Sequence, residues 1–351
     1  MAIKVGIINV TGYAGAELAR LLYNHAEATI TSVTGRSEAG KKLAEVFPHL
    51  ASYDLTVEPE IGSSVDFVFS ALPHAASAEA CAPLIRAGVP VVDISADFRL
   101  HDKAEYREWY GAEHSAPDLL AHAVYGLPEL YREQIQKTKL VANPGCYPES
   151  ALLGLAPAVK AGVVAPDVII DSKSGVSGAG RGLALNLHLG EAGESVSAYG
   201  LNGHRHLPEI VQELTAMWPA AEAPKPAKPK VTFTPHLIPM TRGILSTCYA
   251  AQSGDLPTGD AGKATLRDIY REFYKDEPFV RIVDAPPVTK HARGSNMCLI
   301  YPTLDIRADR VVVVSVLDNL VKGAAGQAIQ NMNLMQGFPE TMALDALAVY
   351  P

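Results

Sequence analysis

In the first 147 residues, short apolar segments alternate with segments whose apolar residues have the periodicity of a helix. This alternation constrains the fold more than any other feature. Between the first two runs, Ala14, Leu18, Leu21 and Leu22 recur at the spacing of one helix face. A second helix is expected from about residue 77 to residue 87. Because strands that alternate with helices join through right-handed crossovers, we expect an α/β fold with a doubly wound parallel sheet. The runs that predict its strands are residues 3–10, 29–34, 65–71, 89–94 and 139–142.

The sequence after Cys146 has a different pattern, with longer alternating runs and an amphipathic helix whose apolar positions lie between residues 266 and 273. This pattern predicts a second, α+β domain with a mostly antiparallel sheet, one face of which can pack on a partner. The chain becomes helical again from Lys322. Residues 219–230 are rich in Pro, Ala and Lys and predict an exposed, semi-rigid loop. The predicted strands cover residues 231–238, 244–250, 297–306 and 311–317.

Composition narrows the classes of partner and compartment. A formal net charge of -8 argues against nucleic acid or an anionic membrane as partner, although local arginines can still bind small anions. The four cysteines are far apart and form no CxxC pair, which fits a reducing compartment and predicts neither disulfide nor metal site. The N-terminus enters a strand pattern without a leader, and no apolar run approaches the roughly 18 residues of a membrane span. We therefore expect a cytoplasmic protein.

The turn between the first strand and the first helix reads GIINVTGYAG at residues 6–15. In parallel sheets this is where a dinucleotide pyrophosphate binds, on backbone N–H groups at a helix N-terminus. The expected glycine trio would occupy positions 9, 12 and 15, but Asn9 replaces the first. Since Asn tolerates left-handed backbone angles, the turn can survive. The alternative is an ordinary strand–helix turn.

Arg36 and Ser37 follow the second strand, where sites that prefer NAD place an acidic residue on the ribose hydroxyls. An arginine and a serine suit a 2′-phosphate instead, so the sequence favours NADP(H) as cofactor. A solvated surface arginine is the alternative.

Cys146 lies in the segment Asn143-Pro144-Gly145-Cys146-Tyr147-Pro148, directly after an apolar run. The two prolines restrict the backbone, and the glycine can take angles that other residues cannot. A sulfur on so stiff a turn at a strand end is well placed as a nucleophile. A buried structural cysteine remains the alternative.

Two histidines flank an arginine in Gly203-His204-Arg205-His206, just before a helix predicted to begin near Pro208. A cysteine nucleophile needs a general acid or base, and histidine serves near neutral pH. In an extended approach residues two apart point the same way, so His204 and His206 could face one cleft.

Three further segments carry candidate binding residues. Arg99 follows the fourth strand at the edge where parallel sheets bind ligands, and it could hold a phosphate or carboxylate. Leu72 and Pro73 follow the third strand at the same edge. Residues 174–181, SGVSGAGR, are too rich in Gly and Ser for a strand or helix, and they offer backbone donors to an anion or a nicotinamide ribose.

With these residues assembled, the chain resembles the N-acetyl-γ-glutamyl-phosphate reductases, which are NADPH-dependent enzymes of arginine biosynthesis. The resemblance runs from Gly6 to the end of the chain. It is carried by GYAG at 12–15, SADFRL at 95–100, YGLPEL at 125–130, NPGCYP at 143–148, SGVSGAGR at 174–181, GHRHLPE at 203–209 and DNLVKGAAGQAIQNMN at 318–333.

The resemblance implies a Rossmann-type, NADP-binding domain of residues 1–147 plus about 322–351, and a domain of residues 148–321 for catalysis, substrate binding and oligomerisation. It implies an acyl-phosphate substrate, a cysteine thioester and a homo-oligomer, either dimer or tetramer. Catalytic roles then fall on Cys146 and His206, and substrate contacts on Arg99, Asn143, His204 and Glu209. Cofactor contacts fall on Gly12, Tyr13, Ala14, Gly15, Arg36, Ser37, Leu72, Pro73, Ser177, Gly178 and Asn319.

Two departures from the family pattern and two rival functions stay open. Asn9 stands where the family usually has glycine, which puts cofactor affinity in doubt, and Glu149 stands where a small threonine is more usual. The sequence favours His206 over His204 as the acid/base without separating their roles. The rivals are a reductase of carrier-protein-bound aminoadipyl phosphate in lysine biosynthesis and a catalytically silent NADP-binding protein.

Overall fold

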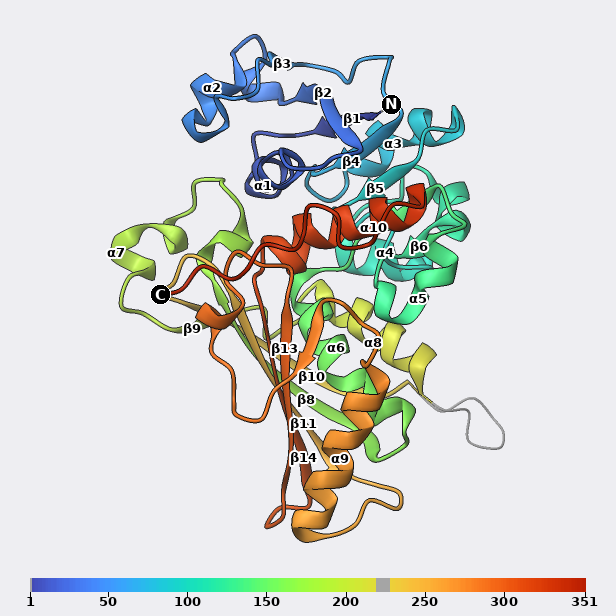
Figure 1. The fold of residues 1–351 in the computed structure, drawn as a ribbon, viewed down its shortest axis with the longest axis vertical. Coiled ribbons are helices and arrows are strands. Elements are labelled where there is room, and N and C mark those ends of the chain that lie inside the picture. Colours follow the sequence, from blue (N-terminus) through green and yellow to red (C-terminus); the bar gives the residue numbers. More distant parts are fainter. Residues whose placement is uncertain (1, 219–227) are drawn as a thin grey trace. The chain divides into compact units, whose positions relative to one another are not determined.

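The computed structural model describes residues 2–218 and 228–351 (Figure 1). The chain divides into two compact units. Unit 1 is Met1–Gly145 with Gly323–Ala346, and unit 2 is Cys146–Lys322 with Leu347–Pro351. Most of the loop predicted over residues 219–230 lies outside the described residues, and Lys230 already begins a strand.

Unit 1 is built on a seven-stranded sheet in the order β3-β2-β1-β4-β5-β7-β6. Every neighbouring pair is parallel, which confirms the predicted parallel sheet. The five predicted strands are present within a few residues, and the two-residue strands β3 and β6 were not predicted. The strands are β1 (Ile3–Ile8), β2 (Ala28–Thr34), β3 (Val57–Glu58), β4 (Phe67–Ser70), β5 (Val91–Asp93), β6 (Val124–Tyr125) and β7 (Leu140–Ala142).

The strand order reverses between β1 and β4, so the helices that follow these two strands lead away in opposite directions. With right-handed crossovers they cover opposite faces of the sheet, which makes it doubly wound as predicted. The last helix of the chain, α10, returns to this unit and contacts α1, α5 and β5. The helices are α1 (Tyr13–Leu22), α2 (Leu43–Val46), α3 (Ser77–Arg86), α4 (Lys103–Tyr110), α5 (Pro128–Ile135) and α10 (Gly326–Gln336), with 3₁₀ turns at Arg36–Glu38, Pro48–Leu50 and Pro117–His122.

Unit 2 holds a second seven-stranded sheet in the order β12-β13-β14-β11-β8-β10-β9. Four of its neighbouring pairs are antiparallel and two are parallel, so the sheet is mixed and mostly antiparallel, as predicted. The strands are β8 (Val164–Gly175), β9 (Ser197–Ala198), β10 (Lys230–Ile238), β11 (Ile244–Gln252), β12 (Val280–Ile282), β13 (Cys298–Asp305) and β14 (Arg310–Leu317).

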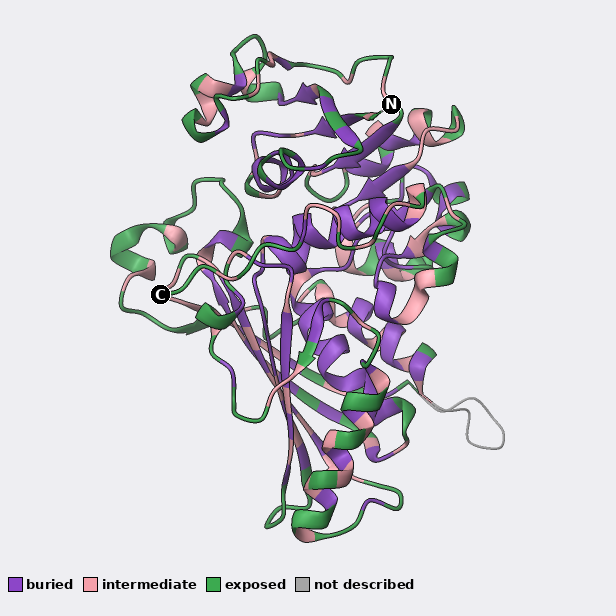
Figure 2. Ribbon diagram, in the orientation of Figure 1, coloured by how far each residue is buried: buried purple, intermediate pink, exposed green. Residues whose placement is uncertain are grey.

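The helices α6, α8 and α9 lie on one side of this second sheet (Figure 1). The burial of β11 and β14 alternates accordingly, with one face of each strand buried and the other only partly covered (Figure 2). The partly covered face carries Leu245, Thr247, Tyr249, Val312 and Val314. The helices of unit 2 are α6 (Cys146–Lys160), α7 (Leu189–Ala192), α8 (His206–Met217) and α9 (Gly259–Phe273), with 3₁₀ turns at Val176–Ala179, Leu185–Leu187 and Thr289–His291.

Three local expectations need correction. Residues 174–181 were expected to form neither strand nor helix, but Ser174 and Gly175 end β8 and Val176–Ala179 is a 3₁₀ turn. The helix predicted near Pro208 begins at His206. The helical stretch from Lys322 opens with a π-helical segment, Val321–Ala325, before α10. Among the described residues, no helix is long and apolar enough to cross a membrane.

Candidate active site

Cys146 is the first residue of α6 and is partly exposed, whereas Cys81, Cys248 and Cys298 are buried. The sequence placed it on a turn at a strand end, and β7 does end four residues earlier, at Ala142. A helix N-terminus carries partial positive charge, so the start of α6 stabilises a negative charge on the sulfur. Pro148 fits the first turn because the N–H that proline lacks has no intrahelical partner there. Cys146 therefore has the exposure and the electrostatic setting of a nucleophile.

The rings of both predicted histidines pack against the ring of Tyr147, the residue that follows the cysteine. Its centroid lies 5.9 Å from that of His204 and 6.0 Å from that of His206. The two histidine rings are 4.8 Å apart. The expected extended approach is wrong, because Arg205 has helical angles (φ -59, ψ -16) and His206 opens α8. The two rings are nevertheless neighbours beside the residue that follows Cys146.

The protonation state of His204 follows from its contacts. The backbone N–H of His206 donates to Nδ1 of His204 at 3.1 Å, so that nitrogen is an acceptor. Burial, reinforced by the positive charge of Arg205, lowers the pKa of His204 to about 4. At neutral pH the ring is therefore uncharged with its proton on Nε2, and it can donate one hydrogen bond from that atom.

Tyr199 completes this cluster and was not found from the sequence. Its ring packs on His204 at 5.4 Å, and its hydroxyl donates to the Tyr147 hydroxyl at 3.2 Å. Tyr147 in turn donates to the backbone carbonyl of His236 at 3.1 Å. Burial raises the pKa of Tyr199 to about 12, so its hydroxyl stays protonated at neutral pH. No periodicity marks Tyr199, which lies in a loop between β9 and α8.

Three of the predicted substrate contacts are buried. Glu209 is fully buried in the first turn of α8. Arg99, only 6% exposed, donates from Nε to the carbonyl of Asn143 at 2.8 Å and from Nη2 to that of Ile94 at 2.8 Å. Arg99 and Asn143 are thus brought together within unit 1, while Cys146 and the histidines belong to unit 2.

Asn143 is completely buried, and its side chain is bonded on both sides. Its amide donates to the carbonyl of Ala324 at 3.2 Å and accepts from Asn331 at 3.1 Å. These bonds join the segment before the cysteine to the C-terminal helical stretch of unit 1. The geometry supports a structural role for Asn143, and its direct contact with substrate stays a prediction.

Asn9 adopts the left-handed conformation that the sequence predicted for it, with φ 64. Its side-chain amide donates to the carbonyl of Ala71 at 2.7 Å, which links the loop after β1 to the loop after β4. Its own carbonyl accepts from the N–H of Gly12 at 3.3 Å. Asn9 therefore supplies the backbone angle of a glycine and also a bond across the point where the strand order reverses.

The predicted cofactor residues of unit 1 fit an anionic dinucleotide. Helix α1 begins after Gly12 with no side-chain cap and no acidic residue in its first turn, which leaves its N-terminus suited to phosphate. A Cβ on Gly12 would meet no atom closer than 3.4 Å, whereas one on Gly15 would lie 2.7 Å from the Cα of Val10. Gly15 is therefore required by the packing of α1, and the space at Gly12 stays open to a ligand. Tyr13 and Ala14 complete the first turn.

Arg36 and Ser37 are exposed at the start of the 3₁₀ turn that follows β2. The neighbouring carboxylate, Glu38, pairs with Lys41 at 2.6 Å. Leu72 is half-buried and Pro73 exposed in the loop after β4. These side chains lie at the carboxyl ends of β2 and β4, which flank β1, and this is the edge at which doubly wound sheets bind ligands.

The predicted cofactor residues of unit 2 are joined by Asn319. Its side-chain amide donates to Ser177 Oγ at 3.0 Å, and its carbonyl oxygen accepts from the N–H of Gly243 at 2.7 Å. A Cβ on Gly178 would lie 3.6 Å from the same amide nitrogen. Asn319 thus fixes the loop that carries Ser177 and Gly178.

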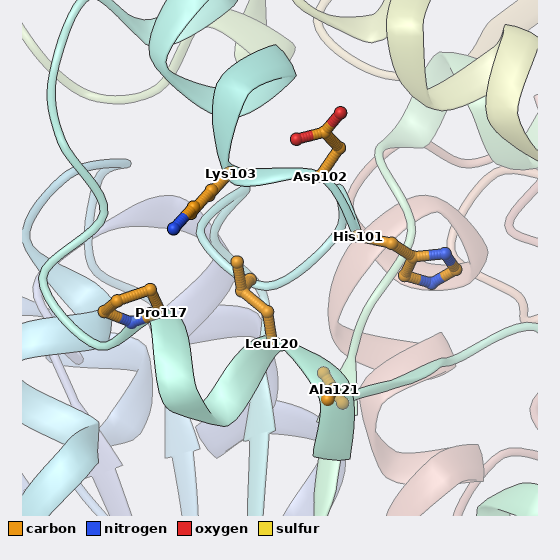
Figure 3. Close-up of a pocket in the computed structure, with 7 residues that line it drawn as sticks. His101, Asp102, Lys103, Pro117, Leu120 and Ala121 are labelled. Atoms are coloured by element: carbon orange, nitrogen blue, oxygen red, sulfur yellow. The ribbon is translucent and has the colours of Figure 1, made fainter.

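A separate pocket of about 690 Å³ lies in unit 1 (Figure 3). None of its lining residues belongs to the predicted site, although His101 follows Arg99 by two positions. In Figure 3 the Asp102 carboxylate points away from Leu120. The pocket is lined by His101, Asp102, Lys103, Pro117, Leu120, Ala121 and Ala123.

Comparison with known proteins shows that both units match domains of semialdehyde dehydrogenases. Residues 4–138 match the family model of the semialdehyde dehydrogenase NAD binding domain, and residues 146–319 match that of the semialdehyde dehydrogenase dimerisation domain. The chain is 53% identical over 348 residues to an N-acetyl-gamma-glutamyl-phosphate reductase of Dehalococcoides mccartyi (strain CBDB1), with 99% of each chain covered. It is 50% identical over 359 residues to one of Pelotomaculum thermopropionicum, with 100% of each covered.

Solved structures agree on the fold. Aspartate semialdehyde dehydrogenase II from Vibrio cholerae superposes with a TM-score of 0.70 at 18% identity, covering 96% of this chain and 99% of its own. The aspartate semialdehyde dehydrogenase with NADP from Candida albicans gives 0.69 at 17% identity, covering 96% and 99%. At these identities the likeness supports the architecture and not the substrate.

Proposed function

This chain belongs to the N-acetyl-gamma-glutamyl-phosphate reductases of the semialdehyde dehydrogenase family, and we propose that it catalyses the reaction of that name. It reduces N-acetyl-L-glutamyl 5-phosphate to N-acetyl-L-glutamate 5-semialdehyde and releases phosphate, a step of arginine biosynthesis in the cytoplasm. The observation that carries the proposal is Cys146 at the N-terminus of α6, followed by Tyr147, against which both histidine rings pack.

The chemistry of the protein begins with the sulfur. The Cys146 thiolate attacks the acyl carbon, a C–S bond forms, and the bond from that carbon to the phosphate oxygen breaks. The product is a thioester on Cys146 and free phosphate. A nicotinamide dinucleotide, when bound, supplies the hydride for reduction. The aldehyde leaves when the C–S bond breaks and the thiolate is restored.

The two histidines divide the proton chemistry between them. His204 is neutral and carries its proton on Nε2, so it serves as a hydrogen-bond donor to a substrate oxygen. His206 acts as the acid/base that moves the proton to and from the substrate oxygen. Tyr199 and Tyr147 hold the rings in place by packing, so that the donor directions stay fixed.

The preference for NADP over NAD rests on Arg36 and Ser37. Both side chains are exposed after β2, and the only carboxylate in the same 3₁₀ turn, Glu38, is paired with Lys41. A guanidinium and a hydroxyl at this edge suit a 2′-phosphate, which carries up to two negative charges.

The active protein is a homo-oligomer, and its association surface is one face of the sheet in unit 2. The face of β11 and β14 opposite the helices carries apolar side chains that are only partly covered. A second copy of the same face is the partner whose chemistry matches, since an apolar surface of this kind is self-complementary about a twofold axis.

The decisive assay runs the reaction in reverse and monitors NADP⁺ reduction with N-acetylglutamate semialdehyde and inorganic phosphate. We expect turnover only when phosphate is present, and little with aspartate semialdehyde or a carrier-linked aminoadipate semialdehyde. Cys146→Ala should lower kcat by at least about a thousandfold, on the scale of losing a nucleophile, while NADPH still binds.

Each contrary result points to a rival. Faster turnover of the carrier-linked semialdehyde would move the protein to lysine biosynthesis. Binding of NADPH without turnover of any of the three semialdehydes would make it a silent NADP-binding protein. Substantial activity of Cys146→Ala would exclude the thioester route.

A further inference from the structure

Two buried charges in unit 2 have no part in the mechanism above. The Lys322 ammonium lies 3.7 Å from Oε1 of Glu149, and both side chains are 0% exposed. The same ammonium lies 5.7 Å from the centroid of the Phe279 ring. Removing two charges from water costs more than an ion pair usually returns, so stability gives no reason for this pair.

The position of Glu149 suggests its effect. It lies three residues after Cys146 in the first turn of α6, and side chains at this spacing are neighbours on one helix face, with Cβ atoms about 5–6 Å apart. A carboxylate so close to the sulfur opposes the formation of a thiolate. It also reduces the benefit that the helix N-terminus gives to that thiolate.

Lys322 supplies the compensating charge from a distant part of the chain. It lies in the π-helical segment Val321–Ala325, four residues after Asp318, and is the last residue of unit 2 before the chain enters unit 1. Asp318 fixes the start of this segment by accepting from the N–H groups of Leu320 and Val321 at 2.8 and 3.2 Å. The backbone that leads into Lys322 is therefore fixed by Asp318.

We propose that Lys322 is a positioning residue for the nucleophile, which cancels the charge of Glu149 so that Cys146 can ionise near neutral pH. This inference rests on Cys146 as the nucleophile of the proposed function. It goes beyond that function because it assigns a task to a fully buried pair that the proposed mechanism does not use.

Other titratable groups surround α6 and have to be held constant. Burial raises the pKa of Cys248 to about 12 and that of Tyr270 well above its usual value, so both stay neutral. His204 is neutral as well. Buried titratable groups on the elements packed against α6, with those beside Cys146, are Tyr147, Tyr199, His204, His206, Glu209, Glu213, Cys248, Tyr270, Tyr274 and Cys298. All of them are shared by the variants below, so their effects cancel in a comparison.

The test is the pH dependence of Cys146 alkylation by iodoacetamide in the intact chain. Only Cys146 among the four cysteines is exposed to any extent, so the folded protein reports on this sulfur, and Cys146→Ala gives the background. Lys322→Met removes the positive charge of the pair and should raise the midpoint by about one pH unit, whereas Glu149→Gln removes the negative charge and should lower it by about one.

Two further variants separate charge from packing. Lys322→Arg keeps the charge and should retain the wild-type midpoint. The double variant Glu149→Gln/Lys322→Met replaces the pair by neutral groups of similar size, a change that buried pairs usually tolerate, and its midpoint should return to the wild-type value. Circular dichroism checks that each variant is folded.

Opposite shifts in the two single variants, cancelled in the double variant, support the proposal. The proposal would be overturned if the alkylation midpoints of both single variants shifted in the same direction or not at all. It would also be overturned if the midpoint of the double variant differed from that of the wild type. Alkylation needs no substrate, so this result is independent of which semialdehyde the enzyme turns over. Failure of the proposed reaction is seen in the turnover assay instead.

Discussion

At the scale of the residue, His204 shows how burial sets a protonation state that matters for stability. Its native pKa of about 4 lies below the usual histidine pKa of 6.5. Between pH 6.5 and 4 the unfolded chain therefore binds a proton here that the native chain does not, and stability falls as the pH drops through this window. Below pH 4 both states are protonated and the effect levels off.

Asp93 acts in the opposite direction over part of the same range. Burial raises its pKa from 3.8 to about 6, so the native state holds a proton that the unfolded state has lost, and stability rises as the pH falls toward 4. The contributions of His204 and Asp93 to the pH dependence of stability partly cancel in the wild type. A substitution at one of the two residues is therefore needed to measure the contribution of either.

We predict that His204→Gln loses less stability than the wild type when the pH is lowered from 7 to 4. The neutral amide has no proton to gain, so the opposing contribution of Asp93 is no longer offset. Urea unfolding at several pH values measures this, with the difference between the two proteins as the readout. Identical slopes of stability against pH would contradict the low native pKa.

Arg36 gives the residue-scale prediction for the cofactor. Arg36→Ala should weaken NADPH binding by roughly 1.5–3 kcal/mol, the range for a hydrogen bond to a charged group, and leave NADH nearly unchanged. Titration of cofactor fluorescence compares the two. Because the side chain is exposed at the start of a 3₁₀ turn, the fold should be unaffected. Equal weakening of both cofactors would make Arg36 structural and remove the main support for NADP preference.

At the scale of the element, the turn before α1 offers a matched pair of glycines. A Cβ on Gly15 would lie 2.7 Å from the Cα of Val10, so α1 must move away from β1, and overpacking of this kind costs about 1–3 kcal/mol. A Cβ on Gly12 has room inside the protein and would instead occupy space next to the helix N-terminus.

We therefore predict that Gly15→Ala lowers the thermal midpoint by several degrees, while Gly12→Ala keeps it and weakens NADPH binding at least about tenfold. Thermal unfolding and a binding titration on both variants separate the two effects. A destabilised Gly12→Ala, or one that binds NADPH like the wild type, would show that this space is not used by the dinucleotide.

Some helices and strands could be predicted from the sequence and others could not. The strands of unit 1 were predicted because buried parallel strands are short, continuous apolar runs. Strand β8 was missed, since Pro166, Asp167 and Asp171, which are exposed or only partly buried, interrupt its apolar pattern. Helix α6 was missed because Pro148 and Pro157 fall inside it and nearly every side chain is buried, which removes the amphipathic signal.

In the candidate site too, only some of the features could be predicted from the sequence. Motifs carried by adjacent residues, such as those around Cys146 and His206, were accessible from the sequence. Contacts between distant residues were not, because they depend on how the chain returns in space. Tyr199 on Tyr147, Asn319 on Ser177 and Lys322 on Glu149 are of this kind.

At the scale of the whole molecule, the partly covered face of the second sheet is the surface that we propose for association with a second copy of the chain. Tyr249 and Val312 are direct neighbours across β11 and β14 on this face. A standard interface buries roughly 800 Å² of each partner, and its centre is depleted of charge. Lysines introduced there would be desolvated without partners, which disfavours association strongly.

We predict that Tyr249→Lys/Val312→Lys converts the proposed homo-oligomer to a monomer that keeps its secondary structure. Both side chains are only partly buried in the single chain, so lysine can extend its ammonium to solvent in the monomer. Light scattering after size exclusion gives the mass, and Tyr23→Lys, which changes a 58% exposed aromatic in unit 1, is the control. A wild type that is already monomeric, or a double variant that remains oligomeric, would show that copies of this chain do not meet at this face.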